Sequence, residues 1–331
     1  MSGSVNGSGS GSVNGAAGRG RQARRPGRPY IPKEREVAVT SADGTRIHAE
    51  IHGEDGRPAV VLAHGWTCSI QYWAAQLADL AVDHRVIVYD LRGHGRSPVP
   101  ANPGGRGGPG AFSVDALADD LEAVLAATLA PGEKAVVVGH SMGGMTVMAA
   151  ARRPVFREHA AAVLLCNTGS SRLVTDMAVV PLRAGRARDR ITRSILGTRL
   201  PLGPVTPLSK RLLRYGTMGP GTAPERVTAC ARIVQACPTV TRAGWARVLD
   251  GLDLDANVPE LKVPTSVLAG AADRMTPPAM SRSLAAALPE CVGLTVLTGV
   301  GHMGPVEAPE AVGEAIRELT AAHLGAKEDT A

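Results

Sequence analysis

Short, uninterrupted apolar runs alternate with helical patterns along most of this chain, and this alternation constrains the fold more than any other feature. Four such runs are rich in Val, Leu, Ile and Ala and lie at 58–64, 85–90, 134–139 and 161–167. A continuous apolar run is typical of a strand that is buried on both faces, because a strand with one solvated face alternates apolar and polar residues. Further strands, each followed by a helical pattern, are expected at 265–270 and 293–298. The sequence therefore predicts an α/β fold with a mostly parallel, doubly wound sheet.

A long interruption separates the fourth apolar run from the fifth. Residues 169–259 contain several prolines and glycines and no strand-like run, and six arginines lie between 183 and 199. We interpret this segment as a helical cap inserted over one edge of the sheet, with residues 29–168 and 260–325 forming the core. Its arginines either select an acidic substrate or form a solvated helical face.

The N-terminal segment differs from the rest in composition. Residues 1–28 are rich in Gly and Ser and repeat the pentapeptide GSVNG, so we expect a disordered tail here, with a second short tail at 326–331. Seven bases and one acid among the first 35 residues account for the whole formal net charge of +6. Such a tail could contact phosphate or a membrane surface, or simply be solvated. The remainder is neutral and has few aromatic residues, so no nucleic-acid partner is expected.

Cysteine usage and hydropathy favour a reducing, aqueous compartment. The five cysteines are scattered and form no CxxC pair, which predicts neither a disulfide framework nor a zinc site. The longest uncharged apolar stretch, at 135–151, is shorter than the ~20 residues that span a bilayer. No secretory signal is recognisable. We expect a cytoplasmic protein without an integral membrane segment.

A serine stands between a predicted strand and a predicted helix, in Gly139-His140-Ser141-Met142-Gly143. A serine hydroxyl is a weak nucleophile until a base takes its proton and the backbone presents it without crowding. A sharp strand-to-helix turn achieves this presentation, and glycines two residues before and after the serine let the backbone pass close by. The alternative is a tight turn in which Ser141 only caps the following helix.

An aspartate and a histidine follow later strands, so the chain order is Ser…Asp…His. His302 comes after the last predicted strand in the sequence GVGHM, and Asp273 follows the strand at 265–270. Alternatively, Asp273 caps a helix or pairs with Arg274. The other usual place for an acid, after the strand at 161–167, holds Asn167, which cannot ionise. Asp273 is therefore the expected acid that orients the histidine.

In these motifs and their order the chain resembles the α/β-hydrolase fold, and in particular small esterases, monoacylglycerol lipases and cofactor-free haloperoxidases. The resemblance implies that Ser141 is the nucleophile, His302 the general base and Asp273 the orienting acid. It further implies an oxyanion hole made by the backbone N–H groups of Trp66 and Met142. Five other motif residues are expected to support the site: His64, Gly65, Gly139, His140 and Gly143.

The expected activity is cleavage of a small-molecule carboxylic ester with an apolar acyl or alcohol part, through an acyl-enzyme and without a metal or cofactor. A serine at this position excludes the epoxide hydrolases and haloalkane dehalogenases of the fold, which use an aspartate there. One alternative is a haloperoxidase or perhydrolase, in which peroxide replaces water at the same triad. The other is a non-catalytic ligand-binding protein on a hydrolase scaffold. His94 and Cys68 are expected to be structural.

Overall fold

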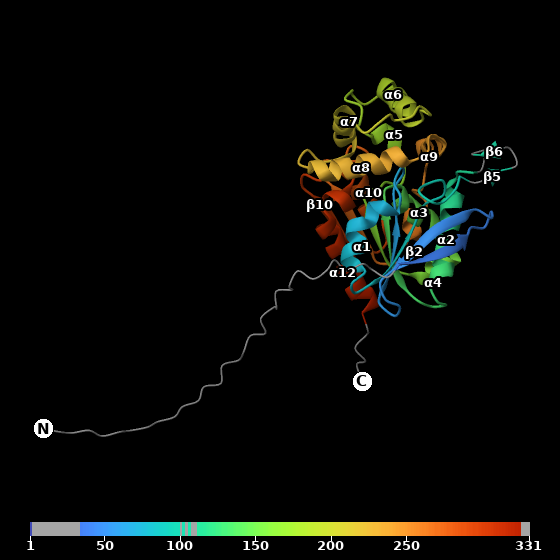
Figure 1. The fold of residues 1–331 in the computed structure, drawn as a ribbon, viewed down its shortest axis with the longest axis vertical. Helices are drawn as coiled ribbons and strands as arrows, with labels where there is room; N and C mark the ends of the chain where they lie inside the picture. The colour runs from blue at the N-terminus through green and yellow to red at the C-terminus, as the bar shows by residue number, and fades with distance from the viewer. Residues whose placement is uncertain (2–33, 100, 103–104, 107–110, 326–331) are drawn as a thin grey trace. The chain divides into compact units, whose positions relative to one another are not determined.

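The computed structural model describes residues 1, 34–99, 101–102, 105–106 and 111–325 (Figure 1). The chain divides into two compact units, 1–30 and 31–331, and all helices and strands described below belong to the second. Of the first unit only Met1 is described, so the tails expected at 1–28 and 326–331 lie outside the described residues. No helix among those that are described is long and apolar enough to cross a membrane.

An eight-stranded sheet forms the centre of the fold, in the order β1-β2-β4-β3-β7-β8-β9-β10. The first two pairings, β1 with β2 and β2 with β4, are antiparallel, and the five that follow are parallel. The strands are β1 (Glu34–Thr40), β2 (Arg46–His52), β3 (Ala59–Ala63), β4 (Arg85–Tyr89), β7 (Ala135–His140), β8 (Ala160–Cys166), β9 (Thr265–Gly270) and β10 (Cys291–Leu297). Two-residue strands β5 (Ala101–Asn102) and β6 (Gly105–Arg106) form a separate small sheet.

The apolar runs are buried on both faces of this sheet, as the sequence predicts. In β3, Val60 and Leu62 pack into one hydrophobic cluster while Val61 and Ala63 pack into a second cluster on the opposite face. The first cluster is covered by η1 (Ile70–Trp73), α1 (Ala74–Leu80) and α12 (Pro309–Leu324). The second is covered by α2 (Val114–Thr128), α3 (Met142–Ala150), α4 (Pro154–His159) and α10 (Pro278–Ala287). The fold is therefore an α/β fold with a doubly wound, mostly parallel sheet.

Five further helices and one short turn of helix lie between β8 and β9. They are α5 (Leu173–Asp176), α6 (Arg186–Leu196), α7 (Pro207–Thr217), α8 (Pro224–Ala236), α9 (Thr239–Asp250) and η2 (Val258–Glu260). In Figure 1, α8 and α9 lie nearest the sheet, and α6 and α7 lie beyond them. Trp245 of α9 anchors this segment, because its buried ring donates a hydrogen bond of 3.2 Å from Nε1 to the carbonyl oxygen of Arg92.

A fully buried ion pair fixes the loop that follows β4. The guanidinium of Arg92 contacts both carboxylate oxygens of Asp120 in α2, at 2.7 and 2.5 Å, and neither side chain is exposed. Arg92 also contacts Asp43 at 2.9 Å, which ties the loop to the turn between β1 and β2. Removing Asp120 would leave the buried guanidinium with only the exposed Asp43 as an ionic partner.

Some element boundaries differ from those expected from the sequence. A single helix is expected over 142–153, but α3 ends at Ala150 and α4 begins at Pro154. The reason is that proline pushes its preceding residue out of the helical region, and Arg153 is extended at φ −76° and ψ 138°. At the far edge, β10 begins at Cys291 and several of its side chains are exposed, including Val292 and Leu294.

Candidate active site

Ser141 lies at the sharp turn between β7 and α3. Its backbone has φ 52° and ψ −116°, in the positive-φ region that residues other than glycine rarely adopt. The two flanking glycines make room for this turn. A Cβ at Gly139 would lie 2.5 Å from the carbonyl oxygen of Gly143, and a Cβ at Gly143 would lie 2.1 Å from that of Ala63. Both positions therefore require glycine.

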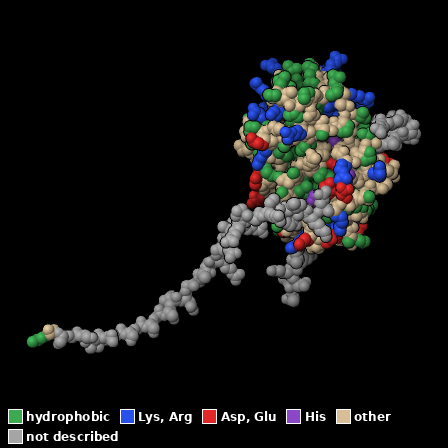
Figure 2. Space-filling view, in the orientation of Figure 1, with side chains coloured by type: hydrophobic (Ala, Val, Ile, Leu, Met, Phe, Trp, Pro, Cys, Tyr) green, Lys and Arg blue, Asp and Glu red, His purple; other side chains and the backbone are tan. Residues whose placement is uncertain are grey.

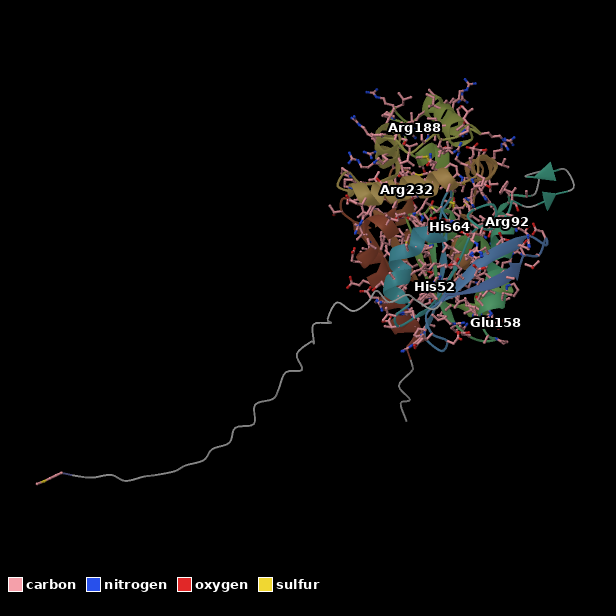
Figure 3. All side chains as sticks on the ribbon, in the orientation of Figure 1. His52, His64, Arg92, Glu158, Arg188 and Arg232 are labelled. Carbon is pink, nitrogen blue, oxygen red and sulfur yellow. The ribbon has the colours of Figure 1, made fainter. Side chains whose placement is uncertain are left out.

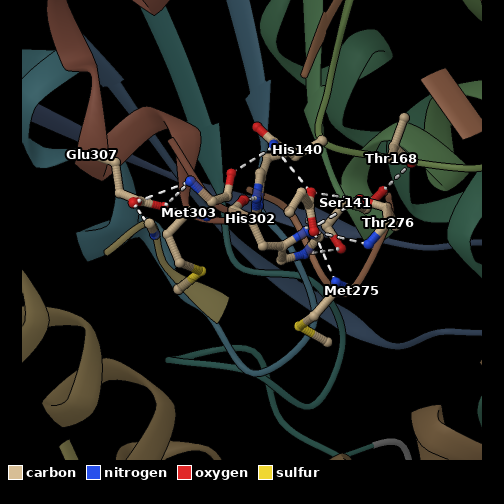
Figure 4. Close-up of polar contacts among 12 residues, drawn as sticks. His140, Ser141, Thr168, Met275, Thr276, His302, Met303 and Glu307 are labelled. Carbon is tan, nitrogen blue, oxygen red and sulfur yellow. Dashed lines mark hydrogen bonds and ion pairs between the residues drawn. The ribbon is translucent and has the colours of Figure 1, made fainter. Parts of the chain in front are cut away.

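Three side chains from separate elements form a continuous hydrogen-bonded chain at this turn (Figure 4). His302, in the loop after β10, places Nε2 3.0 Å from Ser141 Oγ. Its other ring nitrogen, Nδ1, lies 2.9 Å from Asp273 Oδ2, in the loop after β9. Two other carboxylates that could have paired with His302, Asp176 and Asp189 of the inserted segment, pair with arginines instead: Asp176 with Arg172 at 3.2 Å and Asp189 with Arg188 at 3.8 Å.

The Asp273 carboxylate is held by donors on both oxygens. Oδ1 accepts from the backbone N–H groups of Met275 and Thr276 at 2.8 and 2.9 Å. Oδ2 accepts from the Thr276 hydroxyl at 2.9 Å in addition to His302. Burial on its own would raise the pKa of Asp273, but the charge and hydrogen bond of His302 and the Thr276 donors outweigh it and lower the pKa below its ordinary value. The carboxylate is therefore ionised, and its Oδ2 accepts a hydrogen bond from His302 Nδ1.

Asn167 is a member of this network that sequence reasoning missed. It appears in the sequence only as a residue that cannot ionise, yet its Nδ2 donates to Asp273 Oδ2 at 3.0 Å and to the carbonyl oxygen of Gly301 at 2.9 Å. Its position follows from the pairing of β8 with β9, and its own N–H donates to the Leu268 carbonyl at 2.8 Å. Asn167 therefore ties the aspartate to the loop that carries His302.

Glu307 holds the same loop from the other side. Its carboxylate accepts from the backbone N–H groups of Gly301, at 3.1 Å, and Met303, at 3.0 Å, which flank His302 (Figure 4). It also accepts from Gly219 N–H at 2.7 Å and from the Thr222 hydroxyl at 2.6 Å, both in the inserted segment. Glu307 is therefore a second support of the histidine loop that sequence reasoning missed.

Two buried histidines shape the loop after β3. His64 Nε2 accepts a hydrogen bond from Leu91 N–H at 3.1 Å, and its Nδ1 contacts the Gly65 carbonyl oxygen at 2.8 Å. In Figure 3, His64 and Glu158 lie toward opposite ends of the sheet. His94 Nε2 accepts from Thr67 N–H at 3.2 Å, and Thr67 has φ 63°. Burial lowers the pKa of His64 to about 4 and that of His94 to about 3. Both rings are therefore neutral supports.

Two further residues lie near the serine, one at the start of α3 and one in the loop after β3. Met142 is the first residue of α3, so its N–H has no acceptor within the helix. Trp66 lines the same cavity as Ser141, and its Nε1 donates to the carbonyl oxygen of Arg242 in α9 at 3.1 Å. These are the two residues that the resemblance assigns to an oxyanion hole.

His140, one of the residues expected to support the site, contacts the loop that carries His302. Its Nε2 lies 2.8 Å from the carbonyl oxygen of His302 and 3.0 Å from the Tyr72 hydroxyl, and the two histidine rings are 5.1 Å apart. Burial, together with the nearby His302, lowers the pKa of His140 to about 3. Its Nδ1 is buried and has no hydrogen-bond partner among the described residues, and the ring lines the cavity next to Ser141.

An apolar cavity of about 380 Å³ opens at Ser141 between the core and the helices of the inserted segment. Eight of its lining residues are Val, Leu or Ile, and Arg242 is the one Lys, Arg, Asp or Glu among the described residues that line it. A second cavity of about 370 Å³ continues from it and shares five lining residues: Ile195, Leu202, Leu212, Leu213 and Val234. A smaller pocket of about 30 Å³ also reaches Ser141 and His302. The site is therefore a polar chain of residues at the end of an extended apolar channel.

Comparison with known families identifies the class of protein. Residues 58–309 match the model of the alpha/beta hydrolase fold family. The chain therefore belongs to that family, and its family and relatives support a hydrolase.

Two solved structures resemble nearly the whole chain. A thermophilic esterase from Thermogutta terrifontis is 26% identical, with a TM-score of 0.68 over 88% of this chain and 99% of that one. The enol-lactonase from Burkholderia xenovorans is also 26% identical, with a TM-score of 0.66 over 87% of this chain and 100% of that one. Among curated proteins, a probable oxidoreductase, EphD, of Mycobacterium tuberculosis is 38% identical over 116 residues. That match spans 35% of this chain and only 18% of the relative.

Proposed function

We propose that this chain is a serine hydrolase that cleaves a carboxylic ester through an acyl-enzyme. The observation that carries the proposal is the chain of contacts from Ser141 Oγ to His302 Nε2, at 3.0 Å, and from His302 Nδ1 to Asp273, at 2.9 Å. This geometry is what a general base needs to take a serine proton while a carboxylate orients it. The esterase and the enol-lactonase among the structural relatives act on ester bonds by their names, which agrees with the proposal.

In the proposed first step, Ser141 Oγ attacks the ester carbonyl carbon while His302 Nε2 takes the hydroxyl proton. The oxyanion that forms accepts hydrogen bonds from the N–H groups of Trp66 and Met142, a contribution typically worth ~10²–10³ in rate. The ionised Asp273 stabilises the imidazolium, which then gives its proton to the leaving alcohol. In the second step a water molecule, deprotonated by His302, attacks the acyl-enzyme, and the acid leaves as Ser141 regains its proton.

We further propose that residues 169–259 act as a cap, over a core formed by 29–168 and 260–325. The helices of this segment supply most of the aliphatic lining of the cavity above Ser141. An ester with an apolar acyl or alcohol group fits such a lining, since Arg242 is the one fully charged residue among the described residues there.

The proposal is tested with p-nitrophenyl esters of increasing acyl length and with simple lactones. We expect hydrolysis of the esters, with kcat/KM rising from acetyl to medium chains as more of the apolar channel is filled. Ser141→Ala should lose at least ~10³-fold in kcat, whereas Ser113→Ala, which changes a serine that caps α2, should keep the wild-type rate. Hydrolysis by Ser141→Ala at the wild-type rate contradicts the proposal.

A further inference from the structure

The surface formed by α6, α7, the loop between them and the residues just before α6 carries an unusual group of exposed apolar side chains. The structure leaves twelve large hydrophobic residues exposed within the described part of the chain, and eight of them lie between positions 182 and 215. We call these eight the apolar patch: Leu182, Ile191, Ile195, Leu200, Leu202, Leu208, Leu212 and Tyr215. Concentrated apolar surface of this kind marks a site of interaction with another molecule or with a membrane.

The helices present this patch outward as regular stripes. Leu208, Leu212 and Tyr215 are spaced at i, i+4 and i+7, so they share one face of α7, and α7 has no buried residue at all. Ile191 and Ile195 repeat the i, i+4 spacing on α6. A stripe with this spacing ordinarily packs against a core. Here both helices leave it open.

Arginines surround the patch. Nine of the ten charged residues between 177 and 218 are basic, and Asp189 is the one acid. Six exposed arginines in this stretch have no ion pair within the described residues: Arg183, Arg186, Arg190, Arg199, Arg211 and Arg214. Figure 2 shows hydrophobic side chains at the end of the molecule that carries α6 and α7, with Lys and Arg side chains at their margin. The surface is therefore apolar with a cationic rim.

A basic groove adjoins the patch. It has a volume of about 260 Å³ and lies between α7 and the start of α8, where Lys210, Arg211 and Arg214 line it together with Pro207, Pro224 and Val227. Three cations around an open groove match the charge and size of a phosphate group, because guanidinium groups bind phosphate oxygens through paired hydrogen bonds.

We propose that the apolar patch and its arginine rim dock this protein on the surface of an anionic lipid bilayer. In this arrangement the leucines and isoleucines enter the boundary between headgroups and acyl chains, while the arginines contact lipid phosphates. A second copy of the chain fits less well, because two patches placed face to face would bring two arginine rims together.

The docked orientation also connects the bilayer with the active site. Ile195, Leu202, Leu212 and Tyr215 belong to the apolar patch and also line the cavity that reaches Ser141. An ester dissolved in the bilayer could therefore enter the channel without crossing water, and this consequence rests on the proposed function. Docking itself does not, so its test uses Ser141→Ala protein, which leaves the lipids intact.

The charge requirement is tested by cosedimentation of the full-length protein with phosphatidylcholine vesicles, with and without about one third phosphatidylglycerol. We expect binding to the anionic vesicles that weakens as salt is added. Arg186→Gln, Arg190→Gln and Arg199→Gln together should lower the partition coefficient between vesicles and solution about 100-fold, because each arginine contributes about fivefold. The matched control neutralises three exposed cations elsewhere: Arg46, Lys262 and Arg282. The basic N-terminal segment is present in every variant and contributes equally.

The apolar requirement is tested with three patch residues that do not line the cavities. Ile191→Gln, Leu200→Gln and Leu208→Gln together should lower vesicle binding at least tenfold. The control changes three exposed apolar residues outside the patch to glutamine: Val82, Val292 and Leu294. These controls should bind vesicles like the parent protein, and the melting temperature of each variant shows that it is folded.

Three results would overturn the proposal. The first is that the protein does not bind anionic vesicles, or that the triple arginine variant and the triple Ile191/Leu200/Leu208 variant both bind them as strongly as the parent protein. The second is a dimer, measured by light scattering, that the Ile191/Leu200/Leu208 variant dissociates, since a second copy then covers the patch. The third is binding to soluble polyglutamate as strong as to the vesicles, because charge alone would then explain the interaction.

Discussion

Replacing Asp273 by asparagine isolates the charge of the carboxylate while keeping its shape. Two backbone N–H groups, of Met275 and Thr276, point at Oδ1, so the oxygen of an asparagine would stay at that position. Its NH₂ group would then replace Oδ2, where the Thr276 hydroxyl, the Asn167 amide and His302 Nδ1 all now donate. The histidine can avoid a clash between donors only by moving its proton from Nδ1 to Nε2.

That tautomer disables the base, because a protonated Nε2 cannot accept the Ser141 proton. The imidazolium formed during attack would also lose its neighbouring charge. We therefore expect Asp273→Asn to lower kcat by ~10²–10⁴, the range for neutralising a triad acid, which corresponds to about 2.7–5.4 kcal/mol in activation free energy. KM should change little, since Asp273 does not line the cavities at Ser141.

The assay is steady-state hydrolysis of a p-nitrophenyl ester, with thermal unfolding to show that the variants are folded. Asp176→Asn and Asp189→Asn serve as matched controls, because each carboxylate contacts only an arginine of the inserted segment in its ion pairs. Both should stay within about twofold of the wild-type kcat/KM. The reasoning is refuted if folded Asp273→Asn keeps more than a tenth of the wild-type kcat, or if a control variant loses activity in its place.

Three further predictions follow from the same structure. Glu307→Gln should lower kcat by ~10- to 100-fold with KM nearly unchanged, since the carboxylate that positions the loop around His302 loses one acceptor oxygen. The control is Glu310→Gln, which changes an exposed glutamate nearby, and an equal loss in kcat for this control would contradict the role of Glu307. Asp120→Ala should lower the free energy of unfolding by about 3–5 kcal/mol in urea, because Arg92 is left charged and buried. Glu54→Ala, at an exposed pair, should cost little in the same assay. Deleting residues 1–28 should leave the melting temperature and esterase rate unchanged, because their composition predicts no packed structure; a fall in either would show a docked tail.

The sheet could be predicted from the sequence because its inner strands bury both faces. The runs at 58–64 and 134–139 predict buried strands, and β3 and β7 lie at nearly the same residues. Prediction was weaker where local signals compete. The helix expected over 142–153 ends early, at Ala150, and the short helix that begins at Pro154 was not expected, although proline favours the first turn of a helix.

The candidate site could be assembled from short motifs only in part. Ser141, Asp273 and His302 each stand beside a recognisable turn, so their juxtaposition follows from a parallel sheet whose strands end at one edge. Asn167 and Glu307 could not be assigned in this way. The contacts of Asn167 depend on the pairing of β8 with β9, and those of Glu307 depend on a loop that brings Gly219 to its carboxylate. Composition also does not predict which leucines of the inserted segment line the cavity: Leu213 does, whereas Leu208 on the same helix is exposed.

The central claim is that Ser141 forms an acyl-enzyme, and covalent labelling tests it most directly. The protein is treated with a fluorophosphonate probe, and the intact mass and the peptide that carries the adduct are measured by mass spectrometry. We predict one adduct per chain on Ser141, none on Ser141→Ala, and slow labelling of His302→Ala, which lacks the base. An adduct on another residue would contradict the account. So would protein that has been treated with the probe, carries no adduct and still hydrolyses esters at its full rate.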